Sequence, residues 1–207
     1  KLILLRHGES QWNLENRFTG WTDVPLTQKG KMEAVKAGEL IKKNNILINA
    51  VFSSVLKRAN ETAEIALKNA GLDHLWEKNN LKMIKDKSLN ERDYGDLVGL
   101  NKKETADKFG KDQVHIWRRS YDTPPPNGES LKTVVDRVSP YFQDNIKPLI
   151  EKGDNILVAA HGNSLRAMMI ELRIYKPEEI SSIEIPTGLP LCINFQNEKV
   201  FDFKYLD

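Results

Sequence analysis

The sequence predicts an α/β protein with three layers, in which helices flank a mainly parallel central sheet. Short apolar runs, among them Leu2–Leu5 and Asn155–Ala160, alternate with segments whose apolar residues recur at helical spacing. The second run is apolar almost throughout, which is typical of a strand buried on both faces of a parallel sheet. Ligands of such sheets bind at the carboxyl ends of the strands, so chemistry is expected there.

The predicted helices alternate with these strands. One helix follows Thr27, a second covers about residues 56–69 after the strand Val51–Ser54, and two more follow Ser130 and Ser164. Each has an apolar stripe at i, i+3, i+4 and i+7. The hydroxyl side chains of Thr27, Ser130 and Ser164 suit the N-cap positions of their helices.

The chain is expected to form one domain over residues 1–207. It has no internal repeat and no low-complexity linker, and its length suffices for one substantial core. Pro124–Gly128 combines three prolines with Asn-Gly, which predicts a rigid surface connector before the helix that follows Ser130.

Composition excludes several classes of protein. Lys and Arg total 31 against 29 for Asp and Glu, and the net charge of +2 argues against a nucleic-acid or membrane-surface partner. No apolar run approaches the roughly 20 residues that span a bilayer. The single cysteine, Cys192, excludes an internal disulfide and a cysteine-based metal cluster, and suits a cytoplasmic location. We therefore expect no metal.

Two strand-end histidines are the main signal for function. His7 follows the first apolar strand and precedes Gly8, and His161 follows Asn155–Ala160 and precedes Gly162. Glycine permits a tight turn in which backbone N–H groups approach an anion. The pattern predicts that His7 attacks phosphorus. A histidine bonded only to backbone is the alternative, and the second site makes it less favoured.

Cationic residues surround these histidines in the predicted fold. Arg6 precedes His7, and Arg58 lies in the first helical turn after the strand Val51–Ser54, where it would face the same sheet edge. Both are expected to hold phosphoryl oxygens. A solvated helix residue is the alternative for Arg58, and for Arg166 a structural role is favoured.

Two polar segments are ambiguous from composition alone. Glu91 lies in the loop Asn90–Asp96, where it suits a general acid and base, although a solvated acidic loop is the simpler interpretation. The adjacent Arg118 and Arg119 suit a clamp on a second anion, and a solvated basic pair is the alternative.

Together, the motifs resemble those of the cofactor-dependent phosphoglycerate mutases, a branch of the histidine phosphatase superfamily. They span nearly the whole chain in order: Arg6–Asn13, Phe18–Trp21, Glu91–Leu97, Gly99–Lys102, Trp117–Ser120, Asn127–Leu131, Ala159–Arg166 and Pro186–Pro190. Arg-His-Gly alone would indicate only the superfamily. The full set is specific to the mutase branch.

The resemblance implies a reaction that interconverts 3-phosphoglycerate and 2-phosphoglycerate, with 2,3-bisphosphoglycerate as primer and no metal. It implies that His7 is the phosphohistidine nucleophile, Glu91 the proton donor and acceptor, and His161 the transition-state stabiliser, with Arg6 and Arg58 around the phosphoryl group. The substrate contacts carried over by matching position are Ser10, Asn13, Thr19, Gly20, Arg92, Tyr94, Lys102, Arg118, Arg119, Gly162 and Asn163.

The chain departs from longer relatives in two places: it has few residues between Pro126 and Gly128 and few after Phe203. These departures leave undecided whether the protein forms a homo-oligomer and how its active site closes. A phosphatase on the same fold and a non-catalytic domain that binds phosphorylated ligands are the alternative functions. A mutase needs a second cationic set to hold a doubly phosphorylated intermediate, and Lys102, Arg118 and Arg119 favour that function.

Overall fold

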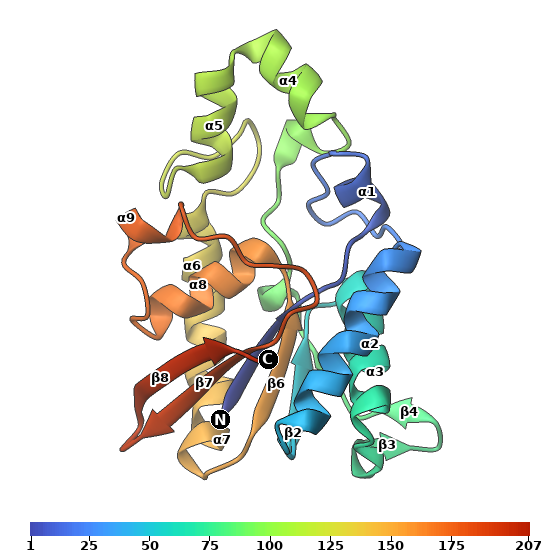
Figure 1. Cartoon of the computed structure of the whole chain (residues 1–207). Coiled ribbons are helices and arrows are strands. Elements are labelled where there is room, and N and C mark those ends of the chain that lie inside the picture. The colour runs from blue at the N-terminus through green and yellow to red at the C-terminus, as the bar shows by residue number, and fades with distance from the viewer.

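The computed structural model describes residues 1–207 and contains a six-stranded central sheet with the strand order β5-β2-β6-β1-β7-β8 (Figure 1). The first four strands in this order are parallel, and β7 and β8 are antiparallel to their neighbours. The strands are β1 (Leu2–Arg6), β2 (Ala50–Ser53), β5 (Ile84–Lys85), β6 (Ile156–Ala160), β7 (Leu191–Gln196) and β8 (Lys199–Tyr205). The predicted fold class is confirmed, with an antiparallel hairpin at one edge.

Helices cover both faces of this sheet (Figure 1). One face carries α2 (Gln28–Lys43) and α3 (Lys57–Ala70), and the other carries α6 (Leu131–Tyr141) and α8 (Gly162–Glu171). A π-helical turn, η4 (Phe142–Ile146), joins α6 to α7 (Lys147–Glu151). The remaining elements are α1 (Gln11–Leu14), β3 (Trp76–Glu77), β4 (Asn80–Leu81), α4 (Lys102–Phe109), α5 (Lys111–Arg119), α9 (Pro177–Ile180) and the short 3-10 turns η1 (Asp73–Leu75), η2 (Lys87–Leu89) and η3 (Gly95–Leu97).

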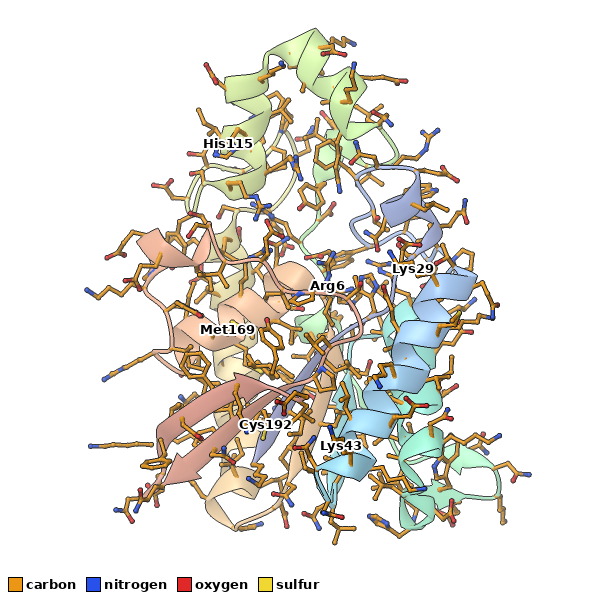
Figure 2. All side chains as sticks on the ribbon, viewed as in Figure 1. Arg6, Lys29, Lys43, His115, Met169 and Cys192 are labelled. Carbon is orange, nitrogen blue, oxygen red and sulfur yellow. The ribbon has the colours of Figure 1, made fainter.

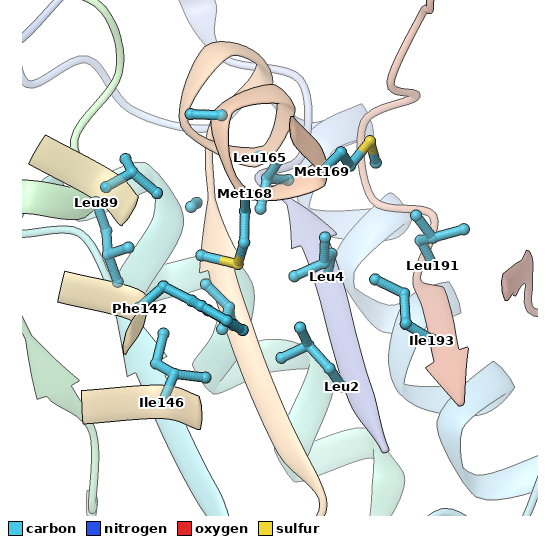
Figure 3. Close-up of a cluster of buried hydrophobic side chains, with 14 of the residues drawn as sticks. Leu2, Leu4, Leu89, Phe142, Ile146, Leu165, Met168, Met169, Leu191 and Ile193 are labelled. Atoms are coloured by element: carbon cyan, nitrogen blue, oxygen red, sulfur yellow. The ribbon is translucent and has the colours of Figure 1, made fainter. Parts of the chain in front are cut away.

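The apolar runs of the strands are uninterrupted because both sheet faces are buried. Leu2 and Leu4 point into the core beneath α6 and α8 (Figure 3), whereas Ile3 and Leu5 point into the core beneath α2 and α3. Side chains alternate between the faces of a strand, so a strand between two helical layers needs apolar residues at every position.

Most predicted helix starts are confirmed, and one is wrong. Thr27 and Ser130 are N-caps whose side chains accept hydrogen bonds from the Gly30 and Thr133 N–H groups. Helix α8 begins instead at Gly162, so its N-cap is His161 and not Ser164. The Ser164 hydroxyl accepts a hydrogen bond from the His161 N–H at 3.1 Å. A hydroxyl at the third helical position can accept a hydrogen bond from the backbone N–H of the N-cap residue, and so help to satisfy the helix N-terminus.

The register of the sheet brings three strand ends together. Arg6 pairs with Ala160, and Ser53 pairs with Ala159, so β1, β2 and β6 end at one edge. The His7 N–H continues this ladder by donating to the Ala160 carbonyl at 3.0 Å. The residues that follow the three strands therefore meet at this edge.

Helices α4 and α5 form an excursion beyond this edge of the sheet (Figure 1). Phe18, Leu97 and Val114 form a small separate core beneath it. Arg6 lies between the sheet and this excursion, whereas His115 lies out on α5 (Figure 2). The excursion and the strand ends enclose the cavity described next.

Candidate active site

The two predicted histidines lie side by side at the carboxyl edge of the sheet. His7 is 3% exposed and His161 is fully buried, and their ring centroids are 5.1 Å apart. His7 Nδ1 lies 2.7 Å from the Gly8 carbonyl oxygen. A carbonyl only accepts hydrogen bonds, so Nδ1 carries the proton of the neutral ring and Nε2 keeps a lone pair. Nε2 is therefore the nucleophilic atom.

The surroundings of His7 keep its ring neutral. Burial lowers its pKa well below the ordinary value, and the charges of Arg58 and Arg6 lower it further. The Arg58 Nε lies 3.4 Å from His7 Nε2. At neutral pH the ring is unprotonated at Nε2 and faces a cation, an arrangement that suits attack on an anionic phosphoryl group.

The turn after β1 is held by a close contact between backbones. A Cβ atom added to Gly8 would lie 2.2 Å from the carbonyl oxygen of Gly30, in the first turn of α2. A Cβ added to Gly30 would lie 2.1 Å from the Glu9 carbonyl oxygen. Both glycines are therefore needed for the approach that places His7.

Arg58 is a buried cation that the N-terminal turn of α3 places in the site, as the sequence predicts. Its side chain is 1% exposed and donates to the carbonyl groups of Thr22 at 2.9 Å and Gly20 at 2.8 Å. Burial lowers its pKa to about 10, so the guanidinium remains charged at neutral pH. The solvated alternative for Arg58 is excluded.

Glu91 turns its carboxylate toward the same cluster. Its Oε1 accepts hydrogen bonds from the N–H groups of Arg92 at 2.7 Å and Asn163 at 3.2 Å. Burial acts to raise the Glu91 pKa, but the Arg92 hydrogen bond and the charges of Arg58 and Arg6 outweigh it, and the net pKa is lowered. Glu91 is thus ionised at neutral pH and able to accept a proton.

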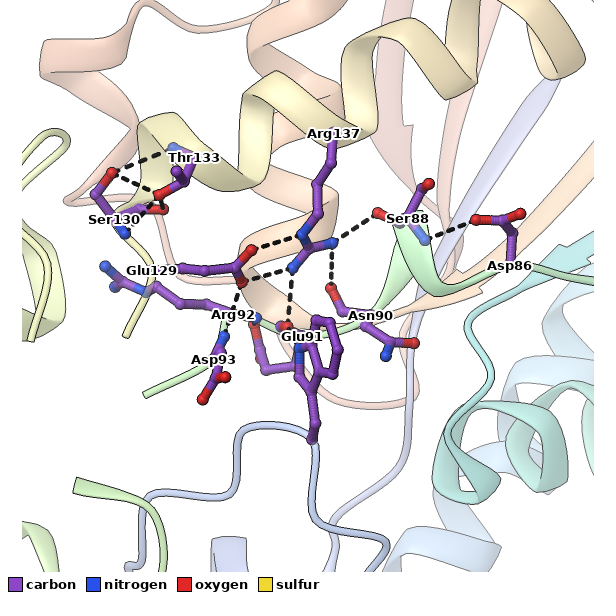
Figure 4. A network of polar contacts seen from close by, with 11 residues as sticks. Asp86, Ser88, Asn90, Glu91, Arg92, Asp93, Glu129, Ser130, Thr133 and Arg137 are labelled. Carbon is purple, nitrogen blue, oxygen red and sulfur yellow. Dashed lines mark hydrogen bonds and ion pairs between the residues drawn. The ribbon is translucent and has the colours of Figure 1, made fainter. Parts of the chain in front are cut away.

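A polar network lies behind Glu91 (Figure 4). The Arg137 side chain, on α6, donates to the carbonyl groups of Ser88 at 2.7 Å and Glu91 at 3.0 Å. It also pairs with Glu129, whose second oxygen accepts the Asp93 N–H at 2.9 Å. No sequence motif assigns Arg137 to the site, because it lies 46 residues after Glu91 along the chain.

The outer part of the site is cationic and comes from the α4–α5 excursion. Lys102, Arg118 and Arg119 lie partly exposed there. Burial, followed by the charges of Arg118 and Arg6, lowers the Lys102 pKa to about 8. Arg119 pairs with the Glu184 carboxylate and donates to the Ser181 carbonyl at 3.2 Å. Two groups of cations therefore face one cavity.

This cavity has a volume of about 130 Å³ and almost no apolar lining. The predicted site residues in its wall are Arg6, His7, Asn13, Thr19, Gly20, Arg58, Glu91, Tyr94, Lys102, Arg118, Arg119, Gly162 and Asn163. A larger hollow of about 1010 Å³ lies between α7, the end of α8 and the hairpin β7–β8, with Phe201 and Phe203 in its wall. It contains no histidine, so the smaller cavity is the candidate active site.

The other predicted site residues lie behind the cavity wall. Ser10 is the N-cap of α1, and its hydroxyl donates to the Asn13 side chain at 2.9 Å. Arg92 is 1% exposed and donates to the backbone carbonyl of Arg118. His161 lies beneath, with its Nε2 at 2.7 Å from the Ser54 hydroxyl. These residues touch the wall rather than form it.

The structure adds wall residues that the sequence did not assign to the site. They are Arg17, Arg166 and Glu184. Arg166 was expected to be structural, and it does donate to the Ile183 carbonyl at 2.8 Å. It also faces the cavity, because it lies one helical turn after Asn163 on α8. No motif identifies Glu184, which the chain reaches only by folding back over the site.

Several buried polar atoms of the site lack a partner within the protein. They include Arg6 Nε, Arg92 Nε and Nη1, and His161 Nδ1. Buried polar atoms without a partner are costly, and a bound anion would satisfy the arginine donors among them. No cluster of three or more His, Cys, Asp or Glu side chains is arranged to hold a metal ion. No helix is both long and apolar enough to cross a membrane.

Comparison with known proteins agrees with this geometry. A family model described as the histidine phosphatase superfamily (branch 1) matches residues 2–202. A protein of Parvibaculum lavamentivorans is 47% identical over 95% of this chain and 91% of its own length. A protein of Bartonella henselae is 46% identical over 98% of this chain and 96% of its own length. Both are named 2,3-bisphosphoglycerate-dependent phosphoglycerate mutase.

Solved structures share the fold. YhfR of Bacillus stearothermophilus is 26% identical, with a TM-score of 0.79 over 96% of this chain and 93% of that one. The product of Rv3214 from Mycobacterium tuberculosis is 27% identical, with a TM-score of 0.76 over 99% of this chain and 95% of that one.

Proposed function

The chain belongs to the histidine phosphatase superfamily, and we propose that within it the protein interconverts 3-phosphoglycerate and 2-phosphoglycerate through a phosphohistidine. The mutases named above share close to half of its residues over nearly its whole length. The observation that carries the proposal is the second cationic group, Lys102, Arg118 and Arg119, in the same cavity as His7. A phosphorylated substrate with a second anionic end needs both groups.

His7 is the group that carries the phosphoryl. Its Nε2 lone pair attacks phosphorus, the P–N bond forms, and the bond from phosphorus to the substrate oxygen breaks. Arg6 and Arg58 neutralise the phosphoryl oxygens during transfer. His161, 5.1 Å from His7 between ring centroids, adds a donor as negative charge develops.

Glu91 moves the proton of the substrate hydroxyl. When that hydroxyl attacks the phosphohistidine, the ionised carboxylate accepts its proton, an O–P bond forms and the P–N bond breaks. In the return step Glu91 gives this proton to the leaving oxygen. The lowered pKa of Glu91 in the free protein suits the base role in the first step.

The other contacts hold the end of the substrate that is not reacting. Lys102, Arg118 and Arg119 face its carboxylate or second phosphate, Tyr94 lies beside them in the wall, and Arg92 supports them from behind. Ser10 orients Asn13 in the wall. Thr19, Gly20, Gly162 and Asn163 complete the wall around the reacting group.

The residues present fit 2,3-bisphosphoglycerate. The unpaired donors of Arg6 and His161 would face one phosphate, and Lys102, Arg118 and Arg119 would hold the other. When bound, this compound supplies the phosphoryl group that loads His7.

A phosphatase on the same fold is the main alternative, since it would pass the phosphoryl group from His7 to water. Solved structures named as phosphatases share only 22–24% of their residues with this chain, which shows the fold alone. A non-catalytic domain is disfavoured because His7 and Glu91 line one cavity and His161 lies directly beside His7.

A coupled assay separates these functions. The protein is incubated with 3-phosphoglycerate and a catalytic amount of 2,3-bisphosphoglycerate, and both 2-phosphoglycerate and inorganic phosphate are measured. Rapid formation of 2-phosphoglycerate with little phosphate supports the mutase. Phosphate as the main product would establish the phosphatase, and neither product would establish a binding domain.

We also propose that residues 1–207 act as one domain in the cytoplasm. Assembly into a homo-oligomer stays a prediction.

A further inference from the structure

The peptide group between Glu91 and Arg92 is held at both ends. Its N–H donates to the Glu91 Oε1 at 2.7 Å, so this peptide positions the carboxylate. Its carbonyl oxygen accepts hydrogen bonds from Arg137 Nη2 at 3.0 Å and from the Trp21 indole at 2.6 Å. A peptide group is planar and rigid, so a group that fixes the carbonyl also fixes the N–H on the other side.

All five N–H donors of the Arg137 guanidinium are hydrogen-bonded to the segment around Glu91 or to Glu129. Besides the Glu91 carbonyl, it donates to the carbonyl groups of Ser88 at 2.7 Å and Asn90 at 3.1 Å. Its Nε and Nη2 donate to the Glu129 carboxylate at 2.8 Å and 2.9 Å. A guanidinium has five N–H donors, and each has a partner here.

The surroundings hold this guanidinium in place. Arg137 and Glu129 side chains are only 19% and 20% exposed. The Arg137 guanidinium lies over the Trp21 ring, 5.8 Å from its centroid. The Glu129 carboxylate also accepts the Asp93 N–H, on the far side of Glu91. Arg137 and Glu129 therefore hydrogen-bond to the backbone of residues 88–93 before, at and after Glu91 (Figure 4).

We propose that Arg137 is a positioning residue for proton transfer, because it holds the Glu91–Arg92 peptide in the orientation that aims and ionises the Glu91 carboxylate. Glu129 supports it through an ion pair, and Trp21 donates a second hydrogen bond to the same Glu91 carbonyl. The inference rests on the proposed function, since it assigns Arg137 to the acid–base group of that reaction. Arg137 itself does not line the cavity.

The expected consequence is a selective loss of turnover. Without Arg137 the peptide can rotate, the Arg92 N–H leaves the carboxylate, and Glu91 is misplaced. Displacement of a reacting group by about 1 Å can cost about 10²-fold in rate. The cationic groups that bind substrate stay in place, so KM should change little.

The first experiment compares Arg137→Met with Lys132→Met, an exposed cation on the same helix. With 3-phosphoglycerate, Arg137→Met should lose about 10²-fold in kcat while its KM stays within about threefold of wild type. Lys132→Met should match wild type in both. Arg137→Lys should recover only part of the loss, because an ammonium cannot span the same set of acceptors.

Trp21→Phe provides a second test that does not depend on the stability of the Arg137 variants. It removes the other donor to the Glu91 carbonyl from a side chain that is already 42% exposed. Its kcat should fall by a smaller factor, about tenfold, again with little change in KM. Losses in KM alone, or kcat within about threefold of wild type in both variants, would overturn the proposal.

A readout without substrate separates this proposal from the proposed function. The Glu91 carboxyl carbon is titrated by NMR in protein labelled with ¹³C-glutamate and assigned by its absence in Glu91→Gln. The Glu91 pKa should rise in Arg137→Met and in Trp21→Phe, and stay unchanged in Lys132→Met. An unchanged Glu91 pKa would refute the role of Arg137. A wild-type protein without mutase activity would refute only the function.

Discussion

The inner and outer ends of the cavity are built differently. His7, His161 and Arg58 lie at the inner end, where the carboxyl ends of strands deliver them, and each is at most 3% exposed. Lys102, Arg118 and Arg119 lie at the outer end on the α4–α5 excursion and are partly exposed. The sheet positions the inner end, whereas the position of the outer end depends on two short helices.

This difference matches two tasks of the proposed reaction. Phosphoryl transfer needs atoms held in one geometry. The doubly phosphorylated intermediate must instead reorient within the site, so its contacts with the protein must break and form again. The arrangement teaches that precise chemistry and substrate reorientation can share one cavity when different elements supply its two ends.

The largest expected effect is at the innermost residue. His7→Ala should abolish labelling by radioactive 2,3-bisphosphoglycerate, because His7 is the only histidine in the cavity wall. In wild type the label should be stable to alkali and labile to acid, as a phosphoramidate is. Labelling of His7→Ala at one phosphate per chain would show that the inner end works without this residue.

Glu91→Gln should follow, with a turnover about 10²–10⁴-fold below wild type, the usual contribution of a positioned acid or base. Substrate binding, measured by calorimetry, should persist. Glu184→Gln is the matched control at the outer end, where the carboxylate is 71% exposed. If both variants keep wild-type turnover, proton transfer does not belong to the inner end.

Arg118→Ala and Arg119→Ala test the outer end. Loss of one charge-assisted contact should weaken substrate binding by about 1.5–3 kcal/mol, or roughly 10–100-fold. The bisphosphate should then leave the site, or water should attack the phosphohistidine, before the intermediate has reoriented. The mutase rate should thus fall more than the phosphatase rate when both rates are measured on one preparation. Equal losses would mean that the two ends are not separate.

The smallest expected effect is a pH dependence that arises at Lys102. With a pKa of about 8, its charge is present below that pH and is lost above it. KM for phosphoglycerate should rise by up to about tenfold from pH 7 to pH 9, where the substrate phosphate is already ionised. The charged groups that act on Lys102 are Arg118, Arg6, Glu91 and Arg119.

Lys102→Arg is the control for this pH dependence, because arginine remains charged throughout. Its KM should stay nearly constant from pH 7 to pH 9. A rise equal to that of wild type would assign the dependence to another group.

Sequence patterns predicted where the inner end lies, whereas at the outer end they left Arg118 and Arg119 ambiguous and only the resemblance assigned Lys102. Strand patterns place His7, His161 and Arg58 at one sheet edge, since parallel strands end together. No local pattern predicts that α4 and α5 fold back over that edge, so Lys102 was assigned by the family motif alone. From composition alone Glu91 would have been solvated, because its partners are backbone N–H groups, one from the next residue and one from Asn163 in a distant segment.

Other residues escaped prediction for the same physical reason. Arg137 acts on carbonyl groups that have no side-chain signature, and Glu184 reaches Arg119 across 65 residues. The wrong N-cap at Ser164 has a different origin. A hydroxyl at the third helical position and one at the N-cap give similar sequence patterns, and here His161 occupies the cap.

The contact between Gly8 and Gly30 has a genetic consequence. Both sides of this contact are main chain, with a Cβ at either glycine meeting a carbonyl oxygen at 2.2 Å or 2.1 Å. A crowded side chain can be relieved by trimming its neighbour, but a peptide group has nothing to trim. A substitution of Gly30, which is distant from the nucleophile along the chain, should therefore be compensated by few second-site substitutions elsewhere in the gene. Activity should be restored mainly by reversion at the Gly30 codon.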